Sequence, residues 1–198
     1  MNTAATSSSV LSWSMGRKAF LVGAVALGAL LASTSCTTTI ENRDPLGEPF
    51  PEVVGEALDG ETLSLPLDEP SVLLIGYVQD AQFDADRWLV GLLQAPPPVR
   101  ILEVPTVVGL FPRLIADTID SGMRSGIPSE DWQSVVTLYG SKADQVLELT
   151  GNERPRNIRV LLLDAEGRVR WFHDRGFSAS KLLELGDAAR LLGEASSD

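Results

Sequence analysis

Cys36 is the only cysteine in the 198-residue chain, so thiol chemistry of any kind depends on it. Arg17-Lys18 and then the uncharged apolar run Ala19–Ala32 precede it, and the small residues Ser33-Thr34-Ser35 stand directly before the thiol. A basic start, an apolar run of this length and a small-residue cleavage zone are typical of an export signal. Cleavage there would leave no thiol for catalysis in the body of the chain.

A cysteine at this position resembles the pattern of bacterial lipoproteins, in which the thiol of the new N-terminus carries diacylglycerol. The resemblance implies a lipoprotein-type signal peptide in residues 1–35 and lipidation of Cys36, with palmitate among the acyl chains. It also implies a location in the bacterial cell envelope, anchored to a membrane by lipid and facing the periplasm or exterior. A cleaved soluble product and an uncleaved anchor remain alternatives, although the run is shorter than the ~20 apolar residues of a spanning helix. Translation from Met1 or from Met15 fits the sequence.

Three aspartates, Asp80, Asp84 and Asp86, could in principle bind a hard cation such as calcium or magnesium. Spacings of four and two residues do not aim all three carboxylates at one point. Acidic side chains are also favoured at the start of a helix, as caps and by the helix dipole. We therefore interpret them as an N-cap and acidic first turn, and predict no metal and no cofactor.

His173 is the only histidine, so it has neither a second histidine nor a free thiol with which to share a metal. We expect it to be exposed at a strand end. The chain also lacks a Gly-x-Ser-x-Gly motif and a glycine-rich phosphate loop. The sequence therefore indicates no catalytic residue.

The charge of the chain excludes several partners. Residues 1–35 hold two of the 16 Lys and Arg and none of the 27 Asp and Glu, so the remainder has a formal net charge of −13. Nucleic-acid binding needs clustered basic residues, and we predict none. Electrostatic adsorption to anionic lipid is equally disfavoured, so membrane attachment would depend on the acyl chains.

Apolar periodicity and turn residues predict an α/β domain. Residues 36–49, with two prolines and no periodicity, are predicted to be a flexible tether, residues 50–192 a domain, and residues 193–198 a tail. The order of elements predicts a mixed sheet flanked by helices, with an N-terminal β-hairpin. The predicted elements are strands 53–57 and 62–65, strand 71–78, a helix around 88–93, strand 99–107, helix 111–123, strand 133–139, a helix from a capping box at 141 to 149, strands 158–164 and 168–172, and helix 182–192.

This order resembles the thioredoxin-like superfamily in its peroxiredoxin-type form. Phe50-Pro51, Leu58–Thr62 and Leu65-Pro66 carry the likeness at the front, and Val160–Trp171 carries it at the back. A narrower likeness, in Ile127-Pro128, Tyr139 and the turn Gly167–Trp171, is to the mitochondrial assembly-factor family needed for the membrane sector of ATP synthase.

The chain departs from these relatives where they place the catalytic cysteine, at the junction of the first central strand and the next helix. That junction, Tyr77–Asp84, contains no cysteine and no serine. Because the thiolate is the nucleophile in thiol–disulfide exchange and in thiol-based peroxide reduction, both reactions are excluded at this site. The fold itself does not confer the activity.

With thiol chemistry excluded, such a scaffold could still bind a ligand in a groove between two segments. One predicted wall is Gln79, Asp80, Ala81 and Gln82. The other is Arg154, Pro155, Arg156 and Asn157, before the strand that follows a cis-proline loop in thioredoxin-like proteins; Pro155 stands earlier than that proline. The leading hypothesis is a redox-inactive envelope lipoprotein that binds a protein partner, of unknown identity, for assembly or scaffolding. The alternative is a non-thiol enzyme using carboxylates or a metal in the same groove.

Overall fold

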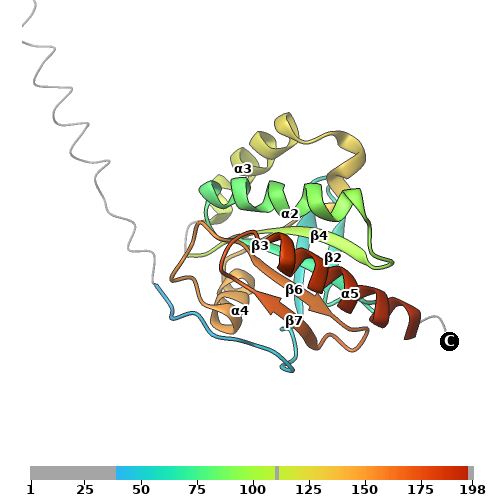
Figure 1. The fold of residues 1–198 in the computed structure, drawn as a ribbon. Helices are drawn as coiled ribbons and strands as arrows, with labels where there is room; N and C mark the ends of the chain where they lie inside the picture. The colour runs from blue at the N-terminus through green and yellow to red at the C-terminus, as the bar shows by residue number, and fades with distance from the viewer. Residues whose placement is uncertain (1–38, 110–111, 196–198) are drawn as a thin grey trace, which may run out of the picture. The chain divides into compact units, whose positions relative to one another are not determined.

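The computed structural model describes residues 39–195 apart from 110–111, and residues 37–198 form one compact unit. Cys36 and the predicted signal peptide lie outside the described residues. Among the described residues no helix is long and apolar enough to cross a bilayer. The elements, labelled in Figure 1, are β1 Val53–Ala57, β2 Thr62–Leu65, β3 Ser71–Gly76, η1 Gln79–Ala81, α2 Gln82–Gln94, β4 Arg100–Val107, α3 Pro112–Gly126, η2 Ser129–Ser134, β5 Val136–Tyr139, α4 Ser141–Thr150, β6 Arg159–Leu163, β7 Val169–His173 and α5 Ala179–Ala195.

The predicted mixed sheet is confirmed, as one seven-stranded sheet in the order β2-β1-β5-β4-β3-β6-β7. β3 pairs in parallel with β4 and antiparallel with β6, and β7 continues the sheet antiparallel to β6. The N-terminal hairpin has the predicted bounds, and its turn contains Gly60 at a φ of +94°. β1 reaches the central strands through antiparallel pairing with β5.

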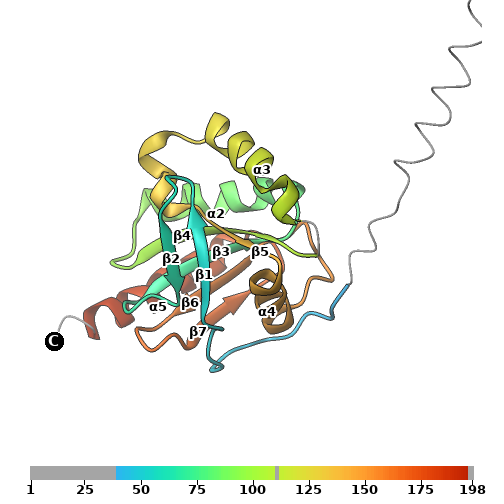
Figure 2. The same cartoon turned by 180° about the vertical axis from the view of Figure 1, so that it is seen from behind.

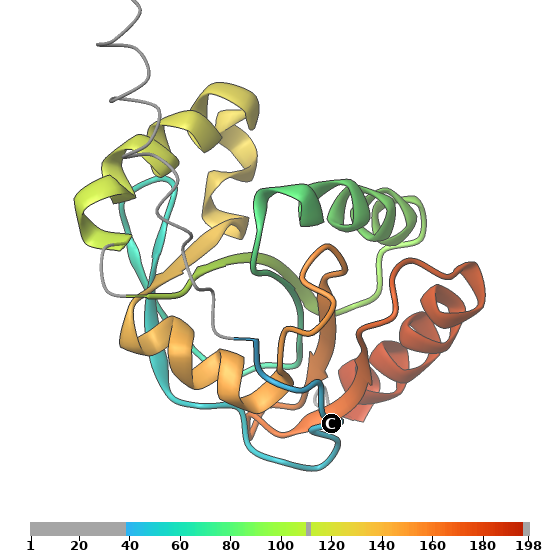
Figure 3. The same cartoon turned by 90° about the vertical axis from the view of Figure 1, so that its left-hand side faces the viewer.

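Helices cover both faces of the sheet. α2 and α5 lie side by side on one face, α4 covers the other, and α3 contacts β5 (Figures 1 and 3). Alternation along β3 divides its side chains between two cores: Leu73 and Ile75 face α4, whereas Val72 and Leu74 face α2 and α5. Trp88 of α2 is fully buried in the second core. β3 is therefore buried on both faces, as its continuous apolar run predicts.

Three local predictions need correction. The helix predicted at the capping box begins at Ser141, but its N-cap is Gly140 at a φ of +60° and no side chain caps it. α2 has Ala81 as its N-cap, so no aspartate fills that position. α5 continues to Ala195, into the predicted tail. The apolar periodicity predicted which residues of this helix face the core, but it did not predict where the helix ends.

The predicted flexible tether is also wrong over residues 40–49, here called the strap, which are hydrogen-bonded along the domain (Figure 2). The strap is held by backbone and side-chain hydrogen bonds to residues more than a hundred positions away in the sequence. A hydrophobic pattern does not predict such contacts. Its main contacts are Ile40 N to Asn152 Oδ1 at 2.8 Å, Glu153 N to Asn42 Oδ1 at 2.8 Å and Gly47 N to Val169 O at 2.8 Å.

Gly151 is the residue that makes room for the strap, which gives a first prediction. Its φ is +67°, and a Cβ there would lie 2.1 Å from the carbonyl oxygen of Glu41. Gly151→Ala should therefore displace the strap and accelerate tryptic cleavage after Arg43. Gly60→Ala is the matched control, since Gly60 has a similar φ but nothing within 4 Å of the added Cβ. We expect Gly60→Ala to lower the free energy of unfolding by ~1 kcal/mol and Gly151→Ala by at least ~1 kcal/mol more. Equal losses and equal cleavage rates would contradict the strap's role.

Candidate functional site

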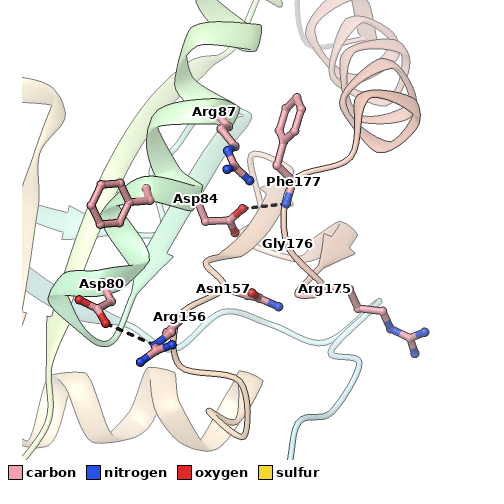
Figure 4. Close-up of a pocket in the computed structure, with 9 residues that line it drawn as sticks. Asp80, Asp84, Arg87, Arg156, Asn157, Arg175, Gly176 and Phe177 are labelled. Atoms are coloured by element: carbon pink, nitrogen blue, oxygen red, sulfur yellow. Dashed lines mark hydrogen bonds and ion pairs between the residues drawn. The ribbon is translucent and has the colours of Figure 1, made fainter.

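The candidate site lies where η1 and the first turn of α2 meet two loops, the one before β6 and the one between β7 and α5 (Figure 4). A cavity of about 370 Å³ opens there to solvent. It is lined by Asp80, Phe83, Asp84, Arg87, Arg156, Asn157, Arg175, Gly176 and Phe177. Of the two segments that the resemblance predicted as groove walls, one contributes Asp80 and the other Arg156 and Asn157. The rest of the lining comes from α2 and from a third segment, Arg175–Phe177.

Asp84, in the first turn of α2, holds both loops in place. Its carboxylate is buried, and Oδ2 accepts the backbone N–H of Ile158 at 3.0 Å while Oδ1 accepts that of Phe177 at 2.7 Å. Each loop therefore donates one hydrogen bond to the same side chain. A carboxylate engaged in this way supports the shape of the cavity.

Arg159, the first residue of β6, holds the loop before β6 by donating hydrogen bonds to its backbone carbonyl groups. Its side chain is fully buried, and Nη1 donates to the carbonyl oxygens of Arg154 at 2.9 Å and Asn157 at 2.7 Å. Nη2 donates to Oδ1 of the strap residue Asn42 at 2.9 Å, and the guanidinium lies over the ring of Tyr77 at 5.2 Å. Burial lowers the pKa of Arg159 from its ordinary value. Charge-assisted hydrogen bonds to three acceptors offset the cost of burying this cation.

Only three of the eight residues predicted for the groove line the cavity. Asp80 and Arg156 form an exposed ion pair, with Nε to Oδ2 at 3.3 Å, and Asn157 donates from Nδ2 to the carbonyl oxygen of Asp174 at 3.2 Å. Ala81 is instead buried in the core beneath α2, and the Gln82 side chain donates to Asp86. The remaining three, Gln79, Arg154 and Pro155, are not among the lining residues. The cis peptide bond of the described chain precedes Pro66, not Pro155.

The three aspartates considered for a cation point to different partners. Asp84 binds the two backbone N–H groups, Asp80 pairs with Arg156, and Asp86 accepts from Gln82 Nε2 at 2.9 Å. Within the described residues, no three His, Cys, Asp or Glu side chains gather into a possible metal site.

His173 is half-buried, so the expectation of an exposed histidine is wrong. Its ring lies 5.7 Å from that of Trp88, and Nε2 is 2.8 Å from the carbonyl oxygen of Gly176. The same Trp88 also packs edge-on against Phe177, at 5.5 Å between ring centroids. His173 therefore belongs to the aromatic support behind the β7–α5 loop.

Both tyrosines of the chain have raised pKa values, which gives a second prediction. Burial raises the pKa of Tyr77 to about 12, and partial burial together with the hydrogen bond to Asp120 raises that of Tyr139. Because the folded pKa of Tyr77 exceeds the unfolded value of about 10, its contribution to stability is complete below pH ~10 and is lost as the pH rises toward 12. Tyrosinate absorbance should thus be absent from the native protein at pH 10.5 and present in urea. Half-ionisation of the native protein at pH 10 would contradict this.

Most of the lining residues could not be predicted from local sequence patterns. Arg87 lies on α2, five residues beyond the first predicted wall, whereas Arg175 and Phe177 belong to another segment that only the folded topology brings to the cavity. Arg159 lies within a run that indicates a buried strand, where a single arginine is unusual. That combination of a charged residue inside an apolar strand was the one available sign of a buried cation.

No family model matches the chain, and no curated protein matches it in sequence. Solved structures, however, match the chain in fold. BsSco, described as a member of the Sco family of cytochrome c oxidase assembly proteins, has a TM-score of 0.54 at 12% identity, over 77% of this chain and 99% of its own. A putative electron transport protein from Aquifex aeolicus VF5 has a TM-score of 0.53 at 17% identity, over 74% of this chain and 98% of its own.

The fold is thioredoxin-like. At these identities the likeness shows the fold alone, and the site must be judged from its own residues. In the thioredoxin-like fold of this chain, the strand–helix junction carries Asp80 and Asp84 and no thiol. The junction borders a solvent-accessible cavity whose walls are held by hydrogen bonds to Asp84 and Arg159.

Proposed function

We propose that this protein is a redox-inactive, thioredoxin-like binding protein that holds a segment of a partner protein in the cavity between α2, the loop before β6 and the β7–α5 loop. The proposal extends to a role in assembly or scaffolding. It is supported by the absence of a thiol from the domain and by a cavity with positioned walls. BsSco, described as belonging to a family of assembly proteins, offers an analogy at the level of fold.

The observation that carries the proposal is the double anchoring of the loop Arg154–Ile158. Buried Asp84 binds the N–H of Ile158, and buried Arg159 binds the carbonyl groups of Arg154 and Asn157. Two buried charged groups are a costly way to fix a solvent-exposed loop. A fixed loop lowers the entropy cost of binding, which is the advantage of a preorganised surface.

Photo-crosslinking tests this function. The side chain of Phe83 is 73% exposed at the cavity, and that of Leu183 is 70% exposed on α5, so the two positions are matched in type and exposure. A photoreactive phenylalanine analogue at Phe83 should give a discrete adduct in the native envelope, and the same analogue at Leu183 should not. Replacing Arg154 and Arg156 by Ala should weaken the Phe83 adduct if the loop is part of the binding wall. Equal adducts at both positions would place the binding surface elsewhere.

The same protein should lack thiol-dependent activity. With no cysteine after residue 36, it should neither reduce disulfides nor consume peroxide. Robust activity in Cys36→Ala would contradict the proposal, because no thiol would remain to account for it.

We also propose that Cys36 carries the lipid anchor, in a bacterial cell envelope. Four peptide steps separate Cys36 from Ile40, where the strap begins, so the chain between them spans at most about 14 Å. A lipid on Cys36 would therefore hold the domain close to the membrane.

Acyl labelling of Cys36→Ala tests the anchor. The variant should lose incorporation of labelled palmitate and should leave the membrane fraction. Unchanged incorporation in this variant would show that the thiol is not the attachment point.

A further inference from the structure

We infer that the cavity selects an acidic partner segment that carries a large apolar side chain. This inference rests on the proposed function and adds the chemistry of the partner. It starts from three arginines of the lining, Arg87 on α2, Arg156 before β6 and Arg175 before α5. They line one cavity from three separate segments, and in Figure 4 the Arg175 side chain extends outward, away from those of Arg87 and Arg156.

Two of these arginines have no ion-pair partner among the described residues. Residues 36–198 contain 27 Asp and Glu against 14 Lys and Arg, yet the ion pairs of the described residues include only six of these cations. Arg156 pairs with Asp80, with both side chains exposed to solvent. Neither Arg87 nor Arg175 forms an ion pair with any described residue within 4.0 Å. Both guanidinium groups are thus unpaired within the described part of the chain, that of Arg87 at the cavity and that of Arg175 at its edge.

The lining arginines outnumber the lining carboxylates by three to two. Asp84 is buried and engaged by two backbone N–H groups, and Asp80 already neutralises Arg156. At physiological ionic strength the Debye length is about 8 Å, so a ligand in the cavity is influenced mainly by these neighbours and little by the distant acidic surface. Planar guanidinium groups bind carboxylates in bidentate geometry, which favours acidic side chains.

An exposed apolar stripe favours a peptide segment over a small anion. Phe83 lines the cavity and is 73% exposed, and Val90 lies two turns further along the same face of α2 at 55%. Arg87 stands between them on that face. A phosphate or a free carboxylate would leave these side chains uncovered, whereas a segment with an apolar residue beside its acidic residues contacts both.

Titration of the 37–198 domain with short capped peptides tests this, since residues 37–198 form a compact unit. The peptides share one central phenylalanine, flanked by Asp and Glu, by Asn and Gln, or by Lys and Arg. The acidic peptide should shift the backbone amide resonances of Asn157, Gly176 and Phe177 and should bind most tightly. Arg87→Glu combined with Arg175→Glu should weaken it by about tenfold. Arg168→Glu combined with Arg190→Glu, at two exposed arginines outside the cavity, gives the same change of net charge and is the matched control; it should change the affinity little.

The outcomes separate this inference from the proposed function. Tighter binding of the amide or basic peptide at the same resonances overturns the acidic preference and leaves the groove in place. Shifts confined to other surfaces, or no shift with any of the peptides, overturn both. If the control pair Arg168→Glu with Arg190→Glu weakens binding as much as the cavity pair does, the effect is one of net charge alone, and the inference is overturned.

Discussion

Asp84→Ala should lower the free energy of unfolding by about 2–5 kcal/mol, because it leaves two backbone N–H groups at a buried position without their acceptor. Both loops that frame the cavity depend on this carboxylate, through Ile158 N and Phe177 N. Urea unfolding of the 37–198 domain measures the loss. Asp84→Asn should fall between the wild type and the alanine variant, since an amide oxygen can accept one of the two N–H groups but its NH₂ opposes the other.

Asp80 and Asp86 supply matched controls on the same stretch of chain. Both carboxylates are exposed, one paired with Arg156 and the other accepting from Gln82. Exposed interactions of this kind contribute little, so each alanine variant should change the free energy of unfolding by less than about 1 kcal/mol. Three similar losses would show that Asp84 is only another acidic residue of the first turn, as the sequence pattern suggested.

The fold could be predicted largely from hydrophobic pattern and turn residues. β3 and β6 stand out as continuous apolar runs, and Asp59-Gly60 marks the hairpin turn, because each feature is local in sequence. The resemblance to the superfamily predicted that residues 79–82 and 154–157 lie on opposite sides of one groove. The ends of helices were less predictable, since Gly140 caps α4 by backbone conformation and Ala195 continues α5 beyond its inner stripe.

The candidate site was predictable only in outline, for a physical reason. Its key contacts join Asp84 to Phe177 and Arg159 to Asn42, residues separated by 93 and 117 positions. Polar contacts at such separation leave no periodic trace in a single sequence. Asp84 was expected to act through the helix dipole, and its actual role as an acceptor for two loops depends on where the topology brings those loops.

The strap, the groove wall and the core meet in one hydrogen-bond network. Asn42 accepts from Arg159 and donates to Asp174 Oδ2 at 2.6 Å, while Asn157 donates to the carbonyl oxygen of the same Asp174. Arg159 in turn binds the carbonyl of Asn157. The segment that leads to Cys36 and the wall of the cavity therefore share partners. Displacement of the strap removes one acceptor of Arg159, whose other bonds set the shape of the wall.

Arg159→Lys tests that network with a substitution that keeps the charge. The ammonium of lysine cannot reproduce the planar fork that reaches the carbonyls of Arg154 and Asn157 together with Asn42. At least one charge-assisted hydrogen bond is lost in a buried site, so the free energy of unfolding should fall by about 2–4 kcal/mol. Arg190→Lys, the same substitution at an exposed arginine of α5, is the control and should have almost no effect.

Hydrogen exchange distinguishes this local role from a general loss of stability. In Arg159→Lys, protection should fall first at the strap amides that pair with Asn152 and Glu153 and at Ile158, ahead of the β3 and β4 amides. Uniform loss of protection across the sheet would mean that Arg159 supports only the core. A wild-type stability and exchange pattern in Arg159→Lys would show that its fork does not position the wall, and the argument that the groove is preorganised by two buried charges would fail with it.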